Sequence, residues 1–283
     1  MERHLERVKL AEELGFAAVW LRDVPLDVPS FGDVGQIFDP FVYLGALAAT
    51  TQRIALGVAS VILPLRHPAH VGKAAASVDV LSGGRLLLGV ASGDRPEEYP
   101  ALGVPFEERG QRFRESVDYL RATQDEFPSF ANGFGELVGA ANPIPKPHGT
   151  RLPLLITGSS RQSQDWVARH GDGWMTYPRS PREQAALAED YRRRAALLGA
   201  PNRPVMQSLY VDLVRPRDRG PRPIHLGFQS GVEFLRAHLR ELEAAGINHV
   251  ALNLRFNADD VESTMARLAE ALLPDFGIET STT

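Results

Sequence analysis

The sequence contains no cysteine among its 283 residues. This absence excludes disulfide bonds, thiolate-ligated metal sites and a cysteine nucleophile. No apolar stretch approaches the roughly 20 residues that a membrane-spanning helix needs. Residues 1–15, MERHLERVKLAEELG, have the pattern of a charged amphipathic helix and differ from a signal peptide. We therefore expect no membrane segment and a cytoplasmic location.

An excess of positive charge is also missing. The chain carries 31 Lys and Arg against 35 Asp and Glu, for a formal net charge of −4 and an isoelectric point near 6.1. Arg192-Arg193-Arg194 is a short basic run, but it lies in a predicted helix, where a solvated face explains it. We therefore expect no nucleic-acid partner.

Two alternating patterns of hydrophobic residues run through the chain. Apolar side chains recur at helical spacing, for example at Val261, Met265, Leu268 and Leu272. Between such stretches lie short apolar runs typical of buried strands. These runs are Ala17–Leu21, Ile54–Leu63, Arg85–Ala91, Pro153–Thr157, Gly173–Tyr177, Val205–Val214 and His249–Leu254. Strands that alternate with helices form parallel βαβ units, so we predict one α/β domain over residues 1–283, a (β/α)8 TIM barrel.

The pattern gives seven strands and about eight helices, and a helix comes before the first strand. An eight-stranded barrel needs one more strand before Glu2. Either the natural start of the protein lies further upstream, or the barrel closes in another way. We favour the upstream start, because a missing barrel strand leaves two open sheet edges.

Two segments interrupt the alternation. Residues 125–150 are rich in Gly, Pro and Asn, and residues 215–223, RPRDRGPRP, are rich in Pro and Arg. We predict both as long loops. Loops of this length are uncommon unless they cover a site or move.

Two motifs at predicted strand ends could bind an anion or a flat ring. GVASGD, residues 89–94, has small residues that allow close approach to the backbone, although a tight turn alone explains it equally well. TGSSRQS, residues 157–163, opens a predicted helix, where backbone N–H groups and serine hydroxyls form an anion site. The alternative is helix capping, since Ser159-x-x-Gln162 fits a capping box.

Two further strand ends carry polar side chains. His67 precedes Pro68 at a corner after the second predicted strand, and a hydrogen-bonded structural histidine is an equally good interpretation. Arg22 and Asp23 follow the first predicted strand, at the end where barrel enzymes place functional groups, although an ion pair closing the strand explains them too. The histidines show no mutual spacing typical of a metal site.

A dedicated set of acid–base or phosphate-binding residues is not evident. The sequence shows no Ser-His-Asp set, no paired-carboxylate signature, no Walker loop and no GxGxxG fingerprint. Such a chain suits chemistry that a cofactor carries.

Together these segments resemble the luciferase-like flavin monooxygenase family, in particular its luciferase-type oxidoreductases. The resemblance rests on LAEELGFAAVWLRD, on the LSGGR turn before GVASGD, and on the later GSS segment, and it covers most of the chain. It implies a barrel that binds FMN or, in sister groups, a deazaflavin coenzyme. It also implies a homodimer that acts on a small molecule.

The resemblance also implies a set of cofactor-binding residues. The family's flavin phosphate lies near the loops that correspond here to Ser92, Gly93, Asp94, Gly158, Ser159, Ser160 and Ser163. A non-proline cis peptide under the flavin ring corresponds to Ala59-Ser60, and a bulge there would support one face of that ring. The candidate catalytic residues remain His67, Arg22 and Asp23.

Three departures from the family limit this comparison. The family's first strand is missing, its histidine after the second strand is replaced by Val24-Pro25, and the reactive cysteine of luciferases corresponds to Ala91. We therefore expect no light emission, and the catalytic base is unassigned. The leading hypothesis is an FMN-dependent monooxygenase with NAD(P)H or a separate flavin reductase as reductant. The alternatives are a deazaflavin-dependent hydride-transfer enzyme and a catalytically silent flavin-binding subunit.

Overall fold

The computed structural model describes residues 3–31, 38–200 and 203–276. Its contacts divide the chain into two compact units, which we describe separately. The central unit comprises Trp20–Gln52 and Leu56–Gly173, and the terminal unit comprises Met1–Val19, Arg53–Ala55 and Trp174–Thr283. A single domain over residues 1–283 stays a prediction.

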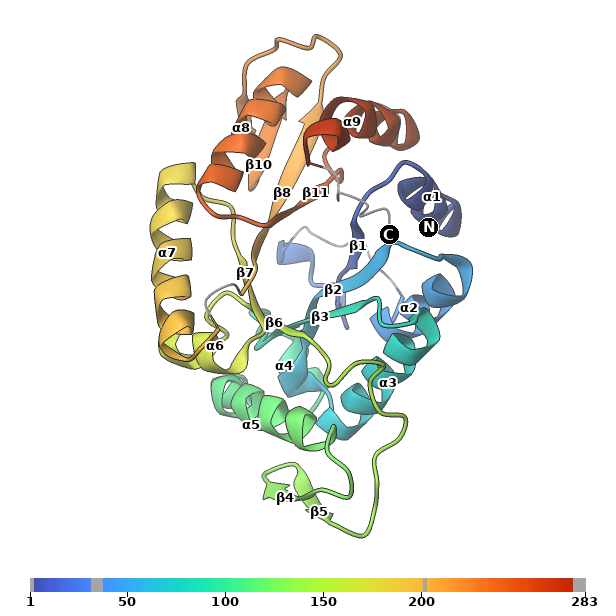
Figure 1. The fold of residues 1–283 in the computed structure, drawn as a ribbon, viewed down its shortest axis with the longest axis vertical. Helices are drawn as coiled ribbons and strands as arrows, with labels where there is room; N and C mark the ends of the chain where they lie inside the picture. The colour runs from blue at the N-terminus through green and yellow to red at the C-terminus, as the bar shows by residue number, and fades with distance from the viewer. Residues whose placement is uncertain (1–2, 32–37, 201–202, 277–283) are drawn as a thin grey trace. The chain divides into compact units, whose positions relative to one another are not determined.

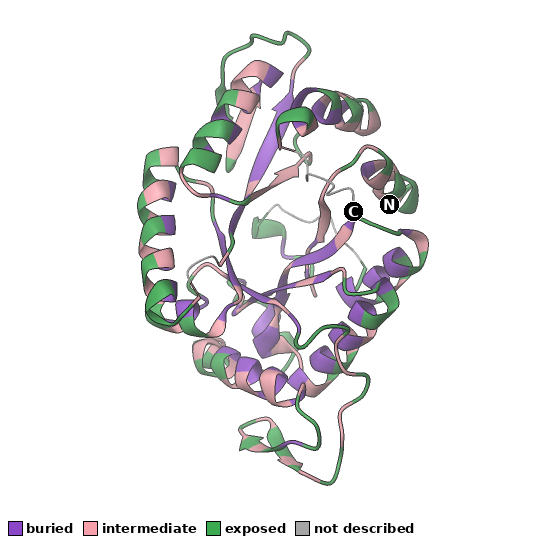
Figure 2. Cartoon of the chain, viewed as in Figure 1, coloured by how far each residue is buried: buried purple, intermediate pink, exposed green. Residues whose placement is uncertain are grey.

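The central unit is built on parallel strands. β2 (Ala55–Ile62) pairs with β3 (Leu86–Ala91), and β3 pairs in turn with β6 (Leu154–Thr157). β1 (Ala18–Leu21) is shared between the two units. The strands are largely buried, as Figure 2 shows. Each apolar run predicted here as a strand is one, to within a residue or two at its ends, because burial on both faces selects continuous apolar runs.

Helices and short 3-10 turns surround these strands. They are η1 (Pro29–Phe31), α2 (Pro40–Thr50), η2 (Leu63–Leu65), α3 (Pro68–Ser82), α4 (Glu98–Ala101), η3 (Phe106–Glu108), α5 (Arg109–Ala122) and α6 (Gln164–His170). Figure 1 shows α2, α3 and α5 along one side of β2, β3 and β6. The contacts of α3 with α2, α5 and β3 make it the centre of this layer.

The LSGGR turn ends α3 and starts β3. Gly83 and Gly84 have φ values of +68° and +85°, a left-handed backbone that favours glycine. The Arg85 guanidinium donates to the carbonyl oxygens of Ala48 (3.3 Å), Thr51 (3.0 Å) and Ser82 (2.8 Å). It therefore satisfies carbonyl groups at the C-terminal ends of α2 and α3, which have no partner within their helices. The motif therefore has a structural role, because it links the ends of two helices at the start of a strand.

The segment 125–150, predicted as a loop throughout, contains an antiparallel hairpin. β4 (Ser129–Asn132) pairs with β5 (Gly135–Val138), and Figure 1 shows the hairpin beyond α5. The hairpin is fixed to α5 because the Asn132 amide donates to the Glu115 carbonyl at 2.8 Å. The loop prediction was therefore wrong for these strands, whose exposed residues lack the apolar alternation that predicts a strand.

The terminal unit is built around the long strand β8. Its elements are α1 (His4–Glu13), β7 (Gly173–Thr176), α7 (Pro181–Leu197), β8 (Val205–Leu213), β9 (Arg222–Ile224), β10 (Gly227–Ser230), α8 (Val232–Ala244), β11 (His249–Asn253) and α9 (Val261–Phe276). β8 pairs in parallel with β7, β10 and β11, and β9 pairs antiparallel with β10. The loop predicted over 215–223 therefore ends in a strand. β10 was not predicted, because Gly227 and Gln229 interrupt its apolar pattern.

Among the strands that the structure describes, β11 pairs only with β8, so no described strand lies along its other edge. This is the kind of edge that the expected additional strand would cover, and that strand stays a prediction. Within the described ranges, no helix is long and apolar enough to cross a membrane.

Candidate functional site

Every candidate site residue lies in the central unit. At the end of β2, the Ala59-Ser60 peptide bond is cis, as the family resemblance implies. The pairing of β2 with β3 also shifts register between Val58 and Val61, at the cis peptide. Ser60 is only 7% exposed, and its hydroxyl shares a hydrogen bond with the hydroxyl of Thr157. This bond links the ends of β2 and β6, which are 97 residues apart in sequence.

The end of β3 requires glycine at position 93. Gly93 has a φ of +74°, and an added Cβ would lie 2.7 Å from both Ile62 Cγ2 and the Tyr99 hydroxyl. The Tyr99 hydroxyl donates to the carbonyl oxygen of Ser92, which is itself buried. Burial raises the pKa of Tyr99 above its usual range, so this phenol stays a neutral donor. The turn at Ser92, Gly93 and Asp94 is therefore held in one conformation.

The end of β6 forms a turn that we call the serine turn, residues 158–163. Gly158, Ser160 and Arg161 have positive φ values of 56°, 44° and 63°. The Ser160 hydroxyl donates to the Thr157 carbonyl at 2.8 Å, and the Ser159 hydroxyl accepts from Arg161 N–H at 3.3 Å. Within the described part of the chain, the N–H groups of Ser159 and Ser160 have no hydrogen-bond partner. Unpaired N–H groups in such a turn form a concave site for an anion.

The helix after this turn starts later than predicted. Ser163 is its N-cap and accepts from Trp166 N–H at 3.2 Å. The Ser159-x-x-Gln162 capping box was therefore wrong, because left-handed residues 160 and 161 delay the helix. Gln162 instead donates to the Gly110 carbonyl at 2.7 Å and accepts from Arg114 at 2.9 Å. These bonds fix the serine turn against the start of α5.

Two arginines flank Gly110 at the start of α5, where Gly110 contacts the serine turn, and neither was predicted from the sequence. The Arg109 guanidinium lies 3.5 Å from the ring centroid of Phe106 and donates to the Phe106 carbonyl, while its Nε is buried without a partner. Arg112 donates to the Pro64 carbonyl at 3.4 Å and lies over the ring of Phe134. Neither has a carboxylate partner among the described residues. Their spacing in RGQRFRE puts them on one helix face, but charged helix faces are usually solvated.

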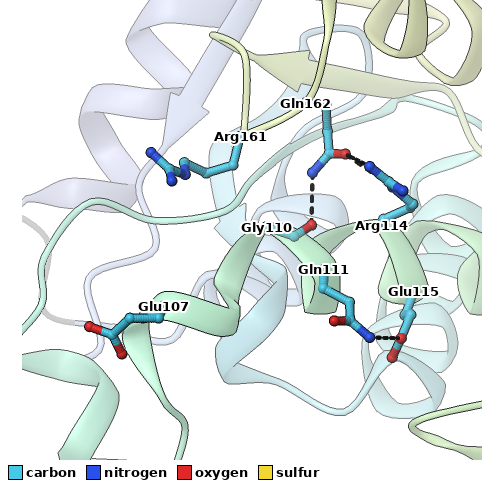
Figure 3. A pocket seen from close by; sticks show the side chains of 7 residues that line it. All are labelled: Glu107, Gly110, Gln111, Arg114, Glu115, Arg161 and Gln162. Carbon is cyan, nitrogen blue, oxygen red and sulfur yellow. Dashed lines mark hydrogen bonds between the residues drawn. The ribbon is translucent and has the colours of Figure 1, made fainter.

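A pocket of about 440 Å³ adjoins the serine turn (Figure 3). It is lined by Glu107, Gly110, Gln111, Arg114, Glu115, Arg161 and Gln162. In Figure 3 the Gln162 amide lies between Gly110 and Arg114, while the side chain of Arg161 points away from them. Arg161 has no ion-pair partner among the residues described, but Glu107 and Glu115 line the same pocket, so its lining carries charges of both signs.

The candidate Asp23 belongs to an ion-pair network. Its side chain is 1% exposed, accepts from Ile62 N–H at 3.1 Å, and pairs with Arg66 at 2.7 Å. Arg66 also pairs at 2.8 Å with Asp39, the N-cap of α2. These contacts support the interpretation of Asp23 as an ion pair that closes a strand end, although its partner is Arg66 and not Arg22. Arg22 is half-buried at the end of β1.

Burial and hydrogen bonding act in opposite directions on Asp39. Burial alone would raise the pKa of this carboxyl. The Arg66 guanidinium and the N–H groups of Val42 and Phe41 outweigh burial and hold the pKa below its usual value. Asp39 therefore stays charged at neutral pH as a cap for α2.

The candidate His67 is the N-cap of α3. Its Nδ1 accepts from Ala69 N–H at 3.2 Å, and its Nε2 lies 2.9 Å from the Phe134 carbonyl oxygen. Because Nδ1 accepts, the ring proton is on Nε2 and donates to that carbonyl. The rings of Tyr119 and Phe134 contact the imidazole edge-on. These contacts support the structural interpretation of His67.

A second buried ion pair follows the β3 turn. Arg95 and Glu98 are 5% and 2% exposed, and their nearest charged atoms are 3.3 Å apart. Burial raises the pKa of Glu98, and the nearby Arg95 opposes that effect. The Arg95 guanidinium also lies over the ring of Phe31, at 5.2 Å. No group of three or more potential metal ligands gathers within the described ranges.

Comparisons with known proteins define the family. The model of the luciferase-like monooxygenase family matches residues 1–211. Uncharacterized protein Rv0953c of Mycobacterium tuberculosis is 33% identical over 187 residues, 60% of this chain and 66% of that protein. The FMNH(2)-dependent dimethylsulfone monooxygenase of Pseudomonas putida is 30% identical over 161 residues, 54% of this chain and 43% of that enzyme. The chain thus spans less than two thirds of the length of either relative.

Solved structures define the fold. Monooxygenase RslO1 from Streptomyces bottropensis has a TM-score of 0.82 at 22% identity, covering 98% of this chain and 93% of that one. An F420-dependent secondary alcohol dehydrogenase has a TM-score of 0.79 at 20% identity, covering 95% of this chain and 93% of that one. These similarities confirm the predicted α/β fold of the luciferase-like barrel type. Since the family model covers well over half of the chain, the protein belongs to the luciferase-like monooxygenase family.

Proposed function

We propose that this protein is an FMN-dependent oxidoreductase, of the monooxygenase type, that acts on a small organic substrate. The observation that carries the proposal is the unsatisfied donor set at the serine turn. Two backbone N–H groups, of Ser159 and Ser160, lack partners there, and Arg109 and Arg112 lack carboxylate partners nearby. A phosphate monoester would satisfy such donors.

The donors come from two elements that touch each other. Gln162 of the serine turn donates to the Gly110 carbonyl, and a Cβ on Gly110 would lie 3.0 Å from Arg161 Cβ. The first turn of α5, which carries Arg109 and Arg112, therefore packs against the serine turn. In this proposal the backbone of Ser159 and Ser160 donates to the phosphate, and the arginines balance its charge. Gly158 and Ser163 complete the turn.

The remaining cofactor contacts follow from the strand ends. The Ser60–Thr157 hydrogen bond places the end of β2 beside the residue that precedes the serine turn. We assign Ala59 and Ser60 to the flavin ring on this ground. Ser92, Gly93 and Asp94 lie at the next strand end, where the absence of a Cβ at position 93 leaves the turn compact. When bound, reduced FMN supplies the electrons, and with oxygen the activated oxygen, that oxidise the substrate.

The protein's own acid–base groups have limited roles in this proposal. His67 and Asp23 are held by structural contacts, so no general base is assigned to either. A separate NAD(P)H-dependent flavin reductase is the proposed source of electrons, and a homodimer is the proposed assembly.

A second candidate is a deazaflavin-dependent enzyme that transfers hydride. The observation that favours it is the likeness of the fold to an F420-dependent alcohol dehydrogenase over 95% of the chain. Titration of the cofactor-free protein with FMN, riboflavin and a deazaflavin coenzyme, followed by fluorescence, separates the two. Preference for FMN supports the first proposal, whereas preference for the deazaflavin replaces it. Flavin binding without turnover by any reductant would indicate a silent flavin-binding subunit.

The substitution Ser159→Asp tests the phosphate site directly. Ser159 is exposed, whereas Ser160 is buried and bonded to Thr157, so a change at 159 perturbs the fold less. The added carboxylate repels a phosphate, and we expect the affinity for FMN to fall at least about tenfold while that for riboflavin is unchanged. Ser263→Asp, on an exposed position of α9 in the terminal unit, is the matched control. Unchanged FMN affinity in Ser159→Asp contradicts the assigned phosphate site.

A further inference from the structure

The turn between β4 and β5 is fixed to the body of the central unit through Phe134. Phe134 N–H donates to the side-chain oxygen of Asn132 at 2.9 Å, and the Phe134 carbonyl oxygen accepts from His67 Nε2 at 2.9 Å. The amide nitrogen of Asn132 donates in turn to the Glu115 carbonyl of α5 at 2.8 Å. Both backbone groups of Phe134 therefore have partners, and its main chain is held in one position.

Aromatic rings hold the same turn against α5. The ring centroids of Phe134 and His67 lie 5.6 Å apart, and those of His67 and Tyr119 lie 5.7 Å apart. The Tyr119 ring, which belongs to α5 and is buried, also contacts Phe130 of β4 edge-on at 5.9 Å. Hydrogen bonds and ring contacts therefore fix both β4 and the turn to α5, and the Phe134 side chain has a defined place beside that helix.

The Phe134 ring supports Arg112 of α5. The guanidinium carbon of Arg112 lies 4.6 Å from the ring centroid, within the roughly 6 Å over which an aromatic face attracts a cation. The hydrogen bond of Arg112 is long, since its Nε lies 3.4 Å from the Pro64 carbonyl oxygen. Within the described ranges, the terminal nitrogens of Arg112 donate to no protein group and pair with no carboxylate. Arg112 therefore keeps donors for an oxyanion, and the ring of Phe134 holds them in place.

Arg112 lies at the strand ends that carry candidate cofactor residues. Pro64, which accepts its Nε–H, belongs to η2, directly after β2. The charge of Arg112 also acts on Tyr99, whose hydroxyl donates to the Ser92 carbonyl at the end of β3. Burial raises the pKa of Tyr99, and the positive charges of Arg109 and Arg112 oppose that rise. The guanidinium of Arg112 is therefore near the ends of β2 and β3, two of the strand ends proposed to hold the cofactor.

From these contacts we infer that Phe134 is a positioning residue for the cofactor phosphate and acts through Arg112. The inference rests on the proposed function, in which Arg112 is a group that balances the charge of the phosphate. An arginine side chain has several rotatable bonds, and ordering it on binding costs conformational entropy. A ring that already holds the guanidinium lowers that cost, so the hairpin raises the affinity for a flavin that carries a phosphate. Phe134 itself makes no contact with the cofactor in this arrangement.

A purely structural role for the Phe134 ring leads to a different expectation. Phe134 is half-buried, and its hydrogen bonds to Asn132 and His67 use main-chain groups that any residue at this position keeps. Replacing the side chain therefore removes the ring beside Arg112 and leaves both hydrogen bonds of the turn. A structural ring would affect the binding of every flavin equally, whereas a positioning ring affects only a flavin with a phosphate.

The test measures the affinities of the intact, cofactor-free protein for FMN and for riboflavin, which lacks the phosphate, by fluorescence titration. Phe134→Ala should lower the affinity for FMN about twofold to fivefold, as expected for the loss of one cation–π contact, and leave that for riboflavin unchanged. Phe134→Tyr keeps the ring and should keep the natural affinity for FMN. Phe127→Ala is the matched control, because it removes a 57% exposed ring from the same segment that contacts no arginine among the described residues.

A double-mutant cycle with Arg112→Gln separates this inference from the proposed function. Once Arg112 is replaced, Phe134→Ala should have no further effect on the FMN-to-riboflavin affinity ratio. The inference alone is overturned if Arg112→Gln lowers that ratio and Phe134→Ala does not. It is also overturned if Phe134→Ala lowers both affinities equally, or if its effect persists in the Arg112→Gln protein. An unchanged ratio in Arg112→Gln overturns the proposed phosphate contact of Arg112, and this inference with it.

Discussion

The two units offer different kinds of surface to a ligand. In the central unit, the ends of β2, β3 and β6 offer backbone groups, small residues and arginines without carboxylate partners. In the terminal unit, β8 and the loops beside it offer the rings of Tyr210, His225 and Phe256. The first surface suits an anionic group held by N–H donors, whereas the rings of the second contact one another.

This difference shows where each unit depends on its sequence. The central site needs glycine and left-handed turns, because its donors are backbone groups whose positions follow the main chain. The ring cluster of the terminal unit needs particular side chains, since its contacts come from Tyr210, His225 and Phe256. Substitutions in the central unit should therefore affect ligand binding there and leave the other unit unchanged.

Gly93→Ala should have the largest effect on the central site. The left-handed backbone costs a non-glycine residue about 1–2 kcal/mol, and the clash of the new Cβ with Ile62 and Tyr99 adds about 1–3 kcal/mol. We expect the free energy of unfolding, measured by denaturant titration, to fall by about 2–5 kcal/mol. FMN binding should be lost as well.

Gly103→Ala is the matched control, because Gly103 has a similar φ of +69° but nothing within 4 Å of an added Cβ. This substitution should lower the free energy of unfolding only by the cost of a left-handed alanine backbone, about 1–2 kcal/mol. Equal destabilisation by the two substitutions would show that close packing at Gly93 contributes nothing.

Arg112→Gln should have an intermediate effect, confined to the phosphate. Because charge-assisted hydrogen bonds are worth about 1.5–3 kcal/mol, the affinity for FMN should fall about tenfold or more. Riboflavin has no phosphate, so its affinity should stay constant and the FMN-to-riboflavin ratio should fall. Fluorescence titration of both flavins measures that ratio.

Arg169→Gln removes the same charge from an exposed position of α6 in the same unit, and it should leave the ratio unchanged. If both arginine variants lowered the FMN-to-riboflavin affinity ratio equally, the fall would come from the lower positive charge of the unit and not from a contact of Arg112 with the phosphate.

Much of the central unit follows from its sequence. The strands there are apolar runs such as Arg85–Ala91 and Pro153–Thr157, and the structure places β3 and β6 within them. Burial on both faces of a parallel sheet leaves few other interpretations of such runs. The cis peptide at Ala59-Ser60 was predicted from the resemblance to the family, not from local propensity.

Other features depend on contacts that no local pattern contains. Arg112 of α5 was missed because the residues around it, Pro64 and Phe134, come from distant segments. The start of α6 was misplaced because positive φ values at Ser160 and Arg161 are set by packing against Gly110. Likewise, Tyr210 and Phe256 become neighbours only through the pairing of β8 with β11.

The smallest expected effect concerns acid stability in the central unit. The Arg66 and backbone contacts hold the pKa of Asp39 below its usual value. A carboxyl group whose pKa is lowered by folding stabilises the protein fully at pH values above its pKa in the unfolded chain, about 3.9. This stabilisation is lost as the pH falls through its lower pKa in the folded protein. The wild-type free energy of unfolding should therefore decline on acidification below about pH 4.

Asp39→Asn isolates this contribution, because asparagine still caps a helix but does not titrate. The side chain of Asp39 is 39% exposed, so solvent screening limits the loss at neutral pH to under about 1 kcal/mol. Denaturant titrations at several pH values should show the two proteins converging in acid, as the wild type alone loses the charged pair. A constant difference across that range would mean that Arg66 is held by Asp23 alone. FMN binding at neutral pH should be equal in both proteins, since Asp39 does not belong to the proposed cofactor site.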